Sequence, residues 1–389
     1  MPGATRRPLL DFLRRIDYLQ LGVVSLLLGI GLVFIRSTGL QVDSEVSRSF
    51  YGKQWMWISA GWAAYILIAA LDYRSFSCRV AVFAGYALSL ILLALALAAG
   101  TRVFGATRWL NVGGFRLQPS EPAKLMVIGV IAAVFSAPYL QGRKLLQLLI
   151  AVFTVAAPFV LIAAEPDLGS ALVLLPVAAA MIFCFGIKWR YVLLGALAIA
   201  ILTGFMVMEG MRKDPLLLRN YQSDRIKVFL NPGMDKGNRG HNAYQAQLAV
   251  GAGGVSGAGI GRGTQNELGF LPHTVSNNDF IFSVIAEEIG FTGVMGLLVL
   301  YALLLYSVLR TAFLASGYGR HIAVGVAALL FCHIFINIGM SIGITPVTGL
   351  PLPLVSYGGS FTLTSMVTMG LVQSIYRGAK RDLEEEARR

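Results

Sequence analysis

The chain has 389 residues, of which 56% are hydrophobic and only 13% are charged. A soluble core of this size does not need so much apolar surface, so the composition excludes a soluble globular protein and indicates a chain that crosses a membrane several times. The net charge of +12 is interpreted as a consequence of topology and of contact with anionic lipid, and nucleic acid is not an expected partner.

Ten stretches are apolar and close to the length of about 20 residues that spans a bilayer. They lie at 18–36, 55–71, 80–98, 122–139, 145–163, 168–187, 190–208, 280–309, 321–344 and 358–376. The first stretch is longer than the apolar part of a signal peptide and lacks a small-residue cleavage site, so we expect it to be retained. The predicted fold is an all-α polytopic membrane protein, with residues 1–389 forming one integral membrane domain.

Lys and Arg residues decide the orientation, because they concentrate in short cytoplasmic loops and at cytoplasmic helix ends. With the N-terminus inside, this side holds most of these cations, including Arg14, Arg15 and Arg310. The loops 164–168 and 345–357 hold none and are placed outside. Both termini are therefore predicted to be cytoplasmic, and the one long excursion, 209–278, falls on the outer face between the seventh and eighth helices.

This outer excursion contains three recognisable parts. The run 225–230 has the pattern of a segment lying on the membrane surface, and a short helix is expected around Tyr244–Val250. The glycine-rich run "GAGGVSGAGIGRG" (251–263) does not satisfy G-x-G-x-x-G and follows no predicted strand. We interpret it as a flexible loop that lets backbones approach closely rather than as a nucleotide site.

Acidic residues occur where three helices begin at the outer face. Glu121 precedes Lys124 in "QPSEPAKL", with Ser120 as the expected cap, and Asp167 opens the sixth helix in "EPDLGSAL". Asp279 is placed in the first turn of the eighth helix. Each could simply complement the helix dipole, and Glu121 with Lys124 could be an ordinary i, i+3 pair.

Cations beside these residues run against the positive-inside trend. Arg102, Arg108 and Lys124 gather at the outer ends of the third and fourth helices. Ionisable groups at membrane depth are costly unless they are paired or face water, so this grouping indicates an anionic ligand on the outer face. Trp109 is either a residue of the interfacial aromatic belt or a platform for a sugar or lipid headgroup.

Helix geometry separates Asp279 from the two carboxylates that follow it. Glu287 and Glu288 lie about 12 and 13 Å deeper along the helix axis, whereas the paired carboxylates of glycoside hydrolases lie roughly 5 to 9.5 Å apart. We interpret Glu287 and Glu288 as buried hydrogen-bonding groups. A lone carboxylate beside cations suits sugar transfer from a diphosphate donor, which needs one general base and charge neutralisation of the leaving group. The donor must be lipid-linked, because soluble nucleotide sugars are absent outside.

Five ordered blocks resemble the SEDS family (shape, elongation, division and sporulation). They are "GATRWLNVGGFRLQPSEPAKL" (105–125), "EPDLGSALV" (165–173), the run 229–272, "NDFIFSVIAEEIGF" (278–291) and "NIGMSIGITPVTGLPLPLVSYGGS" (337–360). The resemblance implies a peptidoglycan glycosyltransferase of the bacterial cytoplasmic membrane that polymerises lipid II outside and works with a class B penicillin-binding protein. "PVTGLPLP" (346–353) is similar to the RodA, elongation-type branch, and a division-type FtsW paralogue is the alternative.

The resemblance also implies roles for individual residues. The essential aspartate of the family falls on Asp279, and cavity residues fall on Arg108, Trp109, Glu121, Lys124 and Asp167. "SYGGS" (356–360) matches as well, and its Ser and glycines serve equally well as a helix start. Two departures are Asn278, where Thr is usual, and His273, whose position carries no assigned role here.

Some expectations stay open at this point. A divalent cation, magnesium or manganese, is left open as an aid in holding the donor diphosphate, and no nucleotide cofactor is expected. A transporter that flips lipid-linked precursor is permitted by charges at membrane depth, although no inverted repeat is visible. A scaffold that only positions the penicillin-binding partner is the third reading.

Overall fold

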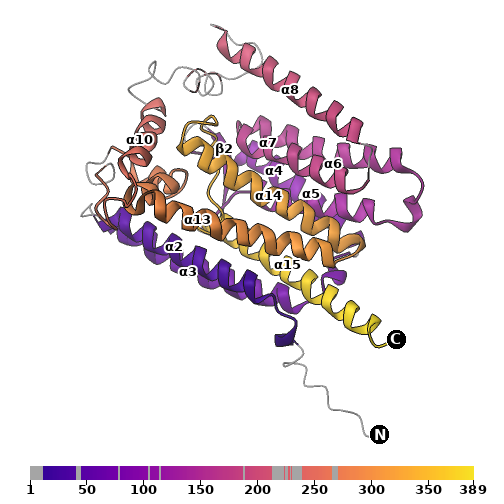
Figure 1. Cartoon of the computed structure of the whole chain (residues 1–389). Coiled ribbons are helices and arrows are strands. Elements are labelled where there is room, and N and C mark those ends of the chain that lie inside the picture. Colours follow the sequence, from indigo (N-terminus) through magenta and orange to yellow (C-terminus); the bar gives the residue numbers. More distant parts are fainter. Residues whose placement is uncertain are drawn as a thin grey trace.

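The computed structural model describes residues 12–40, 45–77, 79–103, 106–113, 115–186, 189–212, 239–264 and 270–389, with the single residues Ser223, Lys227 and Phe229. Each of the ten apolar stretches is a helix in this structure (Figure 1). The ten helices are α2 Tyr18–Leu40, α3 Glu45–Ala70, α4 Arg79–Ala99, α5 Ser120–Phe135, α6 Lys144–Ala164, α7 Leu168–Cys184, α8 Trp189–Met211, α13 Ile281–Leu314, α14 Gly317–Ser341 and α15 Gly359–Glu386. The predicted helical membrane fold is confirmed.

Five of these helices are long and apolar enough to span a bilayer by composition alone, namely α2, α4, α6, α13 and α14. The other helical elements of the described residues are α10 Arg239–Ala252 and the short turns η1 Tyr73–Ser77, η2 Pro138–Leu140 and α12 His273–Ser276. α10 confirms the helix expected around Tyr244–Val250. The run 225–230 lies outside the described residues except for Lys227 and Phe229.

The helices pack around one large apolar cluster, and a small second cluster surrounds Phe280. α15 lies along α3, α13 packs against α2 and α14, and α14 also contacts α5 and α7. Figure 1 shows α13, α14 and α15 between the α2–α3 pair and the group α4 to α7. Arg15 near the N-terminus forms an ion pair with Glu384 near the C-terminus, at 2.6 Å. The first described residues and the end of α15 therefore lie at the same, cytoplasmic end of the bundle, as the charge distribution predicts.

A small antiparallel sheet between α4 and α5 was not predicted. Its strands are β1 Thr101–Val103, β2 Ala106–Val112 and β3 Phe115–Leu117, in the order β1-β2-β3. β1 and β3 have three residues each, which gives a weak signal, and the turn between β2 and β3 uses Gly113 at φ 57°. The sheet lies over the outer helix ends, where β2 contacts α4 and β3 contacts α15.

The apolar stretch 280–309 predicted one straight helix, but α13 is broken. Gly290 has φ 64° and ψ −169°, and this breaks the helix into two parts. The glycine-rich segment enters the break: the amides of Ala258 and Gly259 donate to the carbonyl oxygens of Glu287 and Glu288, both at 2.9 Å. A side chain is excluded at Gly253, where a Cβ would come within 2.0 Å of the Ala286 oxygen. The predicted close backbone approach is confirmed, but the segment is a packed insertion rather than a free loop.

Candidate active site

Lys124 is the centre of a buried polar cluster beneath the outer face. Its side chain is 1% exposed, and its Nζ lies 2.9 Å from Glu121 Oε1 and 2.9 Å from His333 Nε2. The pair with Glu121 was predicted, but it is buried rather than on a helix surface. Removing one partner of such a pair strands the other charge, at a cost of about 3–5 kcal/mol.

His333 on α14 was missed in the sequence. Its Nδ1 lies 3.4 Å from the Pro351 carbonyl oxygen. A carbonyl oxygen can only accept, so Nδ1 carries the proton and Nε2 is left to accept from the Lys124 ammonium. A histidine in the middle of an apolar helix was the available signal, because polar groups at membrane depth usually have a partner.

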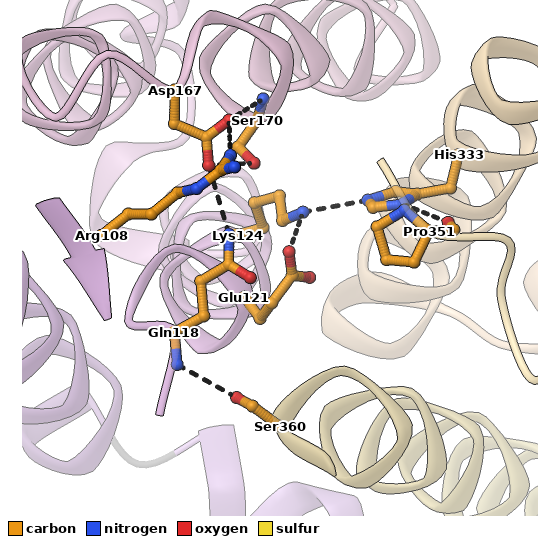
Figure 2. A network of polar contacts seen from close by, with 9 residues as sticks. All are labelled: Arg108, Gln118, Glu121, Lys124, Asp167, Ser170, His333, Pro351 and Ser360. Atoms are coloured by element: carbon orange, nitrogen blue, oxygen red, sulfur yellow. Dashed lines mark hydrogen bonds and ion pairs between the residues drawn. The ribbon is translucent and has the colours of Figure 1, made fainter. Parts of the chain in front are cut away.

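Asp167 anchors a second cluster beside the first (Figure 2). It caps α7, where its carboxylate accepts from the Ser170 amide at 3.3 Å and the Ser170 hydroxyl at 3.0 Å. It also accepts from Gln118 Nε2 at 3.2 Å and pairs with Arg108 Nη1 at 3.4 Å. Burial acts to raise the pKa of Asp167, but Arg108 and Ser170 outweigh it and the net pKa is lowered. Asp167 is therefore ionised at neutral pH.

Glu165, two residues before Asp167, has the opposite protonation state. Its side chain is fully buried, and neither carboxylate oxygen has a hydrogen-bond partner in the described part of the chain. Burial and then the Asp167 charge raise the pKa of Glu165 to about 8, although Arg108 acts to lower it. Glu165 is a neutral acid across most of the physiological range, so the cluster carries one negative charge where the sequence shows two.

Asp279 lies in the turn between α12 and α13, and it is partly exposed. α13 begins at Ile281, so the placement of Asp279 in the first helical turn was wrong by two residues. The reason is that the amides of Asp279 and Phe280 both bond to the Val275 oxygen, at 3.0 and 3.1 Å, which continues the preceding turn. The carboxylate is thus presented on a turn at the outer end of α13.

The outer segment 345–357 clamps this turn. Ser356 Oγ donates to the Asn278 oxygen at 2.7 Å, and the Tyr357 amide donates to the Asn277 oxygen at 2.9 Å. Asn337 on α14 donates to the Asp279 oxygen at 2.9 Å and to the Leu350 oxygen at 2.7 Å. The backbone that carries Asp279 is therefore fixed by three separate donors.

The segment "SYGGS" contains the start of α15, as expected, and its two serines make further contacts. Gly358 is the N-cap of α15 and offers no side-chain cap. Ser356 binds the Asp279 turn, and Ser360 Oγ accepts from the Gln118 amide at 3.4 Å. Ser120 also fails as a cap: Pro119 is the N-cap of α5, without a side-chain hydrogen bond.

α14 connects the two halves of the site. His333 and Asn337 are one turn apart on it, so they face the same side. His333 reaches Lys124, whereas Asn337 reaches the backbone of Asp279. Figure 2 shows the Arg108 and Lys124 clusters side by side at the outer end of α5. The structure therefore brings Arg108, Glu121, Lys124 and Asp167 together and joins them to Asp279 through α14.

Trp109 does not join these clusters. It follows Arg108 on β2, and successive residues of a strand point to opposite faces. Strand alternation therefore predicts that Trp109 lies on the face of β2 opposite Arg108. The side chain of Arg102 lies outside the described residues.

Glu287 and Glu288 are buried hydrogen-bonding groups, as predicted. Glu288 accepts from Ser37 Oγ and from the Gly261 amide, and Glu287 accepts from Thr264 Oγ1 at 2.9 Å. In the described residues no group of three or more His, Cys, Asp or Glu side chains is arranged to hold a metal ion.

Known proteins resemble the chain over most of its length. The sequence profile of the FtsW, RodA and SpoVE family, described as cell cycle protein, matches residues 18–381. Peptidoglycan glycosyltransferase MrdB of Escherichia coli K12 is 38% identical over 76% of this chain and 77% of its own length. The probable peptidoglycan glycosyltransferase FtsW of a Thioalkalivibrio species is 32% identical over 97% of this chain and 94% of its own length.

Solved structures agree with this assignment. A chain from a peptidoglycan synthase complex that coordinates polymerization and crosslinking superposes with a TM-score of 0.76 at 29% identity, covering 94% of this chain and 99% of that chain. The rod shape determining protein RodA of Thermus thermophilus gives a TM-score of 0.67 at 28% identity, covering 93% of this chain and 97% of that chain. The chain belongs to the FtsW, RodA and SpoVE family of multi-pass membrane proteins.

Proposed function

We propose that Asp279 is the general base with which this peptidoglycan glycosyltransferase polymerises lipid II on the outer face of the cytoplasmic membrane. The observation that carries the proposal is the fixed position of Asp279. It is a partly exposed carboxylate on a turn that three donors clamp, connected through α14 to buried cations. A general base needs such placement, because proton transfer depends on geometry before it depends on pKa.

The chemistry follows from these groups. Asp279 takes the proton of the acceptor's 4-hydroxyl, and that oxygen forms a bond to the anomeric carbon of the donor sugar as the bond to the diphosphate breaks. The diphosphate leaves with the electron pair and with growing negative charge. Direct displacement from the opposite face inverts the anomeric centre.

The cations neutralise the leaving group. Arg108 pairs with Asp167 through one nitrogen and is 13% exposed, and its planar guanidinium matches the geometry of phosphate oxygens. Lys124 is closed off from solvent, so it contributes a fixed positive charge beneath the site, and Glu121 and His333 hold it there. Trp109, on the other face of β2, is proposed as the platform for a sugar or headgroup.

The divalent cation stays a prediction. The oxygens of the donor diphosphate would hold it beside Arg108 and Lys124, and it would supply further charge neutralisation at the leaving group. Polymerisation measured with and without a chelator tests this expectation.

The partner is proposed to be a class B penicillin-binding protein, because the chain resembles part of a synthase complex that couples polymerization to crosslinking. The elongation-type, RodA-like role is supported by "PVTGLPLP" (346–353) and by the 38% identity with MrdB. Similar identities to FtsW proteins leave the division-type role as the alternative.

Asp279→Asn tests the base role in a lipid II polymerisation assay with purified protein and partner. The substitution keeps the shape of the side chain and removes its basicity, so we expect a rate at least about 100-fold lower. Glu385→Gln, at the exposed cytoplasmic end of α15, is the control and should retain full activity. Full glycan synthesis by a folded Asp279→Asn protein would overturn the proposal.

A further inference from the structure

A pocket of about 110 Å³ lies at the cytoplasmic ends of α3 and α15, at the opposite end of the bundle from Asp279. Its wall includes Arg15, Leu71, Asp72, Ser374, Arg377 and Arg381. The first half of α15 lies beside α3, and Figure 1 shows the rest of α15 continuing to the C-terminus at this end of the molecule. No step of the glycosyl transfer uses these residues.

Local contacts hold the pocket in shape. Arg377 and Arg381 are four residues apart on α15 and therefore share one face. Arg377 donates to the Ala69 oxygen, and its guanidinium lies 4.0 Å from the centre of the Phe12 ring. Arg381 Nη2 lies 2.8 Å from Asp72 Oδ2, and Ser374 Oγ donates to the Leu71 oxygen at 2.6 Å. The arginines are fixed before any ligand arrives.

The wall carries an excess of positive charge. Three guanidinium groups face one carboxylate, Asp72, while the acidic partner of Arg15, Glu384, is outside the wall. Arg377 Nε is buried without a hydrogen-bond partner in the described part of the chain. Clustered guanidinium groups repel one another unless an anion lies among them, and their planar N–H donors match phosphate oxygens.

The position favours a lipid over a free ion. Leu71 in the wall is 43% exposed and Leu67, one turn earlier on α3, is 61% exposed. An acyl chain could cover these side chains while its headgroup enters the pocket. Basic pockets between transmembrane helices on the cytoplasmic side commonly bind acidic headgroups. We propose that this pocket binds the phosphate of an anionic phospholipid of the inner leaflet.

The test is binding of phosphatidylglycerol to the full-length protein in neutral detergent, measured by native mass spectrometry over a lipid titration. Arg381→Gln should weaken the apparent Kd about fivefold, the factor that corresponds to about 1 kcal/mol for one cation near the membrane surface. Asp72→Asn removes the competing carboxylate and frees Arg381, so it should tighten binding by a similar factor. A purely structural role for these residues predicts no gain in Asp72→Asn.

Arg74→Gln is the matched control. Arg74 also pairs with an aspartate, Asp382, on the cytoplasmic face, but it does not line the pocket. The Arg74→Gln protein should bind phosphatidylglycerol with the same affinity as the unsubstituted protein. The unsubstituted protein should bind phosphatidylcholine poorly. Equal losses in Arg381→Gln and Arg74→Gln, or equal affinity for both lipids, would overturn the proposal. If millimolar inorganic phosphate displaced phosphatidylglycerol, the pocket would be a site for free phosphate, and the claim that it selects a lipid would be wrong.

Discussion

At the scale of single residues, two carboxyl groups of one short turn are held in different protonation states. Arg108 and Ser170 keep Asp167 charged, whereas Glu165 has no hydrogen-bond donor in the described part of the chain and stays neutral. The sequence "EPD" shows only that both are acidic. Their states depend on burial and on Arg108, which comes from a strand almost sixty residues earlier.

Glu165 makes stability depend on pH in a predictable direction. Its pKa rises from 4.5 to about 8 on folding, so between these values the folded protein holds a proton that the unfolded chain releases. Stability from this group is therefore fully present below about pH 4.5 and is lost as pH rises towards 8. Glu165→Gln is uncharged at every pH. We expect the melting temperature of the unsubstituted protein to fall more steeply between pH 5 and 8 than that of Glu165→Gln.

Thermal melting at a series of pH values checks this expectation. Glu385→Gln, exposed at the end of α15, should follow the curve of the unsubstituted protein. Parallel curves for Glu165→Gln and the unsubstituted protein would show that Glu165 is not protonated in the fold.

At the scale of elements, the break in α13 and the glycine-rich segment form one unit. The break leaves carbonyl groups of Glu287 and Glu288 without helical partners, and the amides of Ala258 and Gly259 satisfy them. Beyond the break, the Phe291 amide donates to the Gly254 oxygen at 2.9 Å. This insertion fixes the outer part of α13, at whose end the Asp279 turn lies.

Gly253→Ala should disturb this unit. A Cβ at Gly253 would lie 2.0 Å from the Ala286 oxygen, so the two backbones must separate. We expect a loss of at least about 1–3 kcal/mol in stability, together with reduced polymerisation. Gly251 lies in α10 with open space around its Cα, and Gly251→Ala should be neutral or more stable by up to about 1 kcal/mol. Equal melting temperatures for the two variants would contradict the claim that the glycine-rich segment fixes the outer part of α13.

At the scale of the whole molecule, the sequence predicts those features that depend on local pattern. Hydropathy locates all ten helices, and i, i+3 spacing finds the Glu121–Lys124 pair. The sheet was missed because its two edge strands have only three residues each. The break in α13 was missed because its cause, residues 253–259, lies about thirty residues earlier. His333 and Asn337 act through partners on other elements, and no periodicity within α14 reveals them.

The same helix, α14, offers the final prediction. His333 accepts from the Lys124 ammonium and is buried, so His333→Phe leaves that charge with Glu121 alone while keeping a ring against Phe361. A hydrogen bond to a charged group contributes about 1.5–3 kcal/mol, so the polymerisation rate should fall about tenfold or more. Gln supplies an oxygen that can accept, so His333→Gln should recover most of the activity. A general packing defect would not distinguish Phe from Gln in this way.

His321 provides the matched control on α14. It lies near the cytoplasmic end, against Phe135 and Phe185, so His321→Phe should leave polymerisation near that of the unsubstituted protein. A positioning role for His333 also predicts that its loss lowers kcat much more than it changes KM for lipid II, because the donor does not contact the imidazole. If His333→Phe matched His321→Phe in rate, Lys124 would not depend on α14. The link between the buried cations and the Asp279 turn would then have no functional consequence.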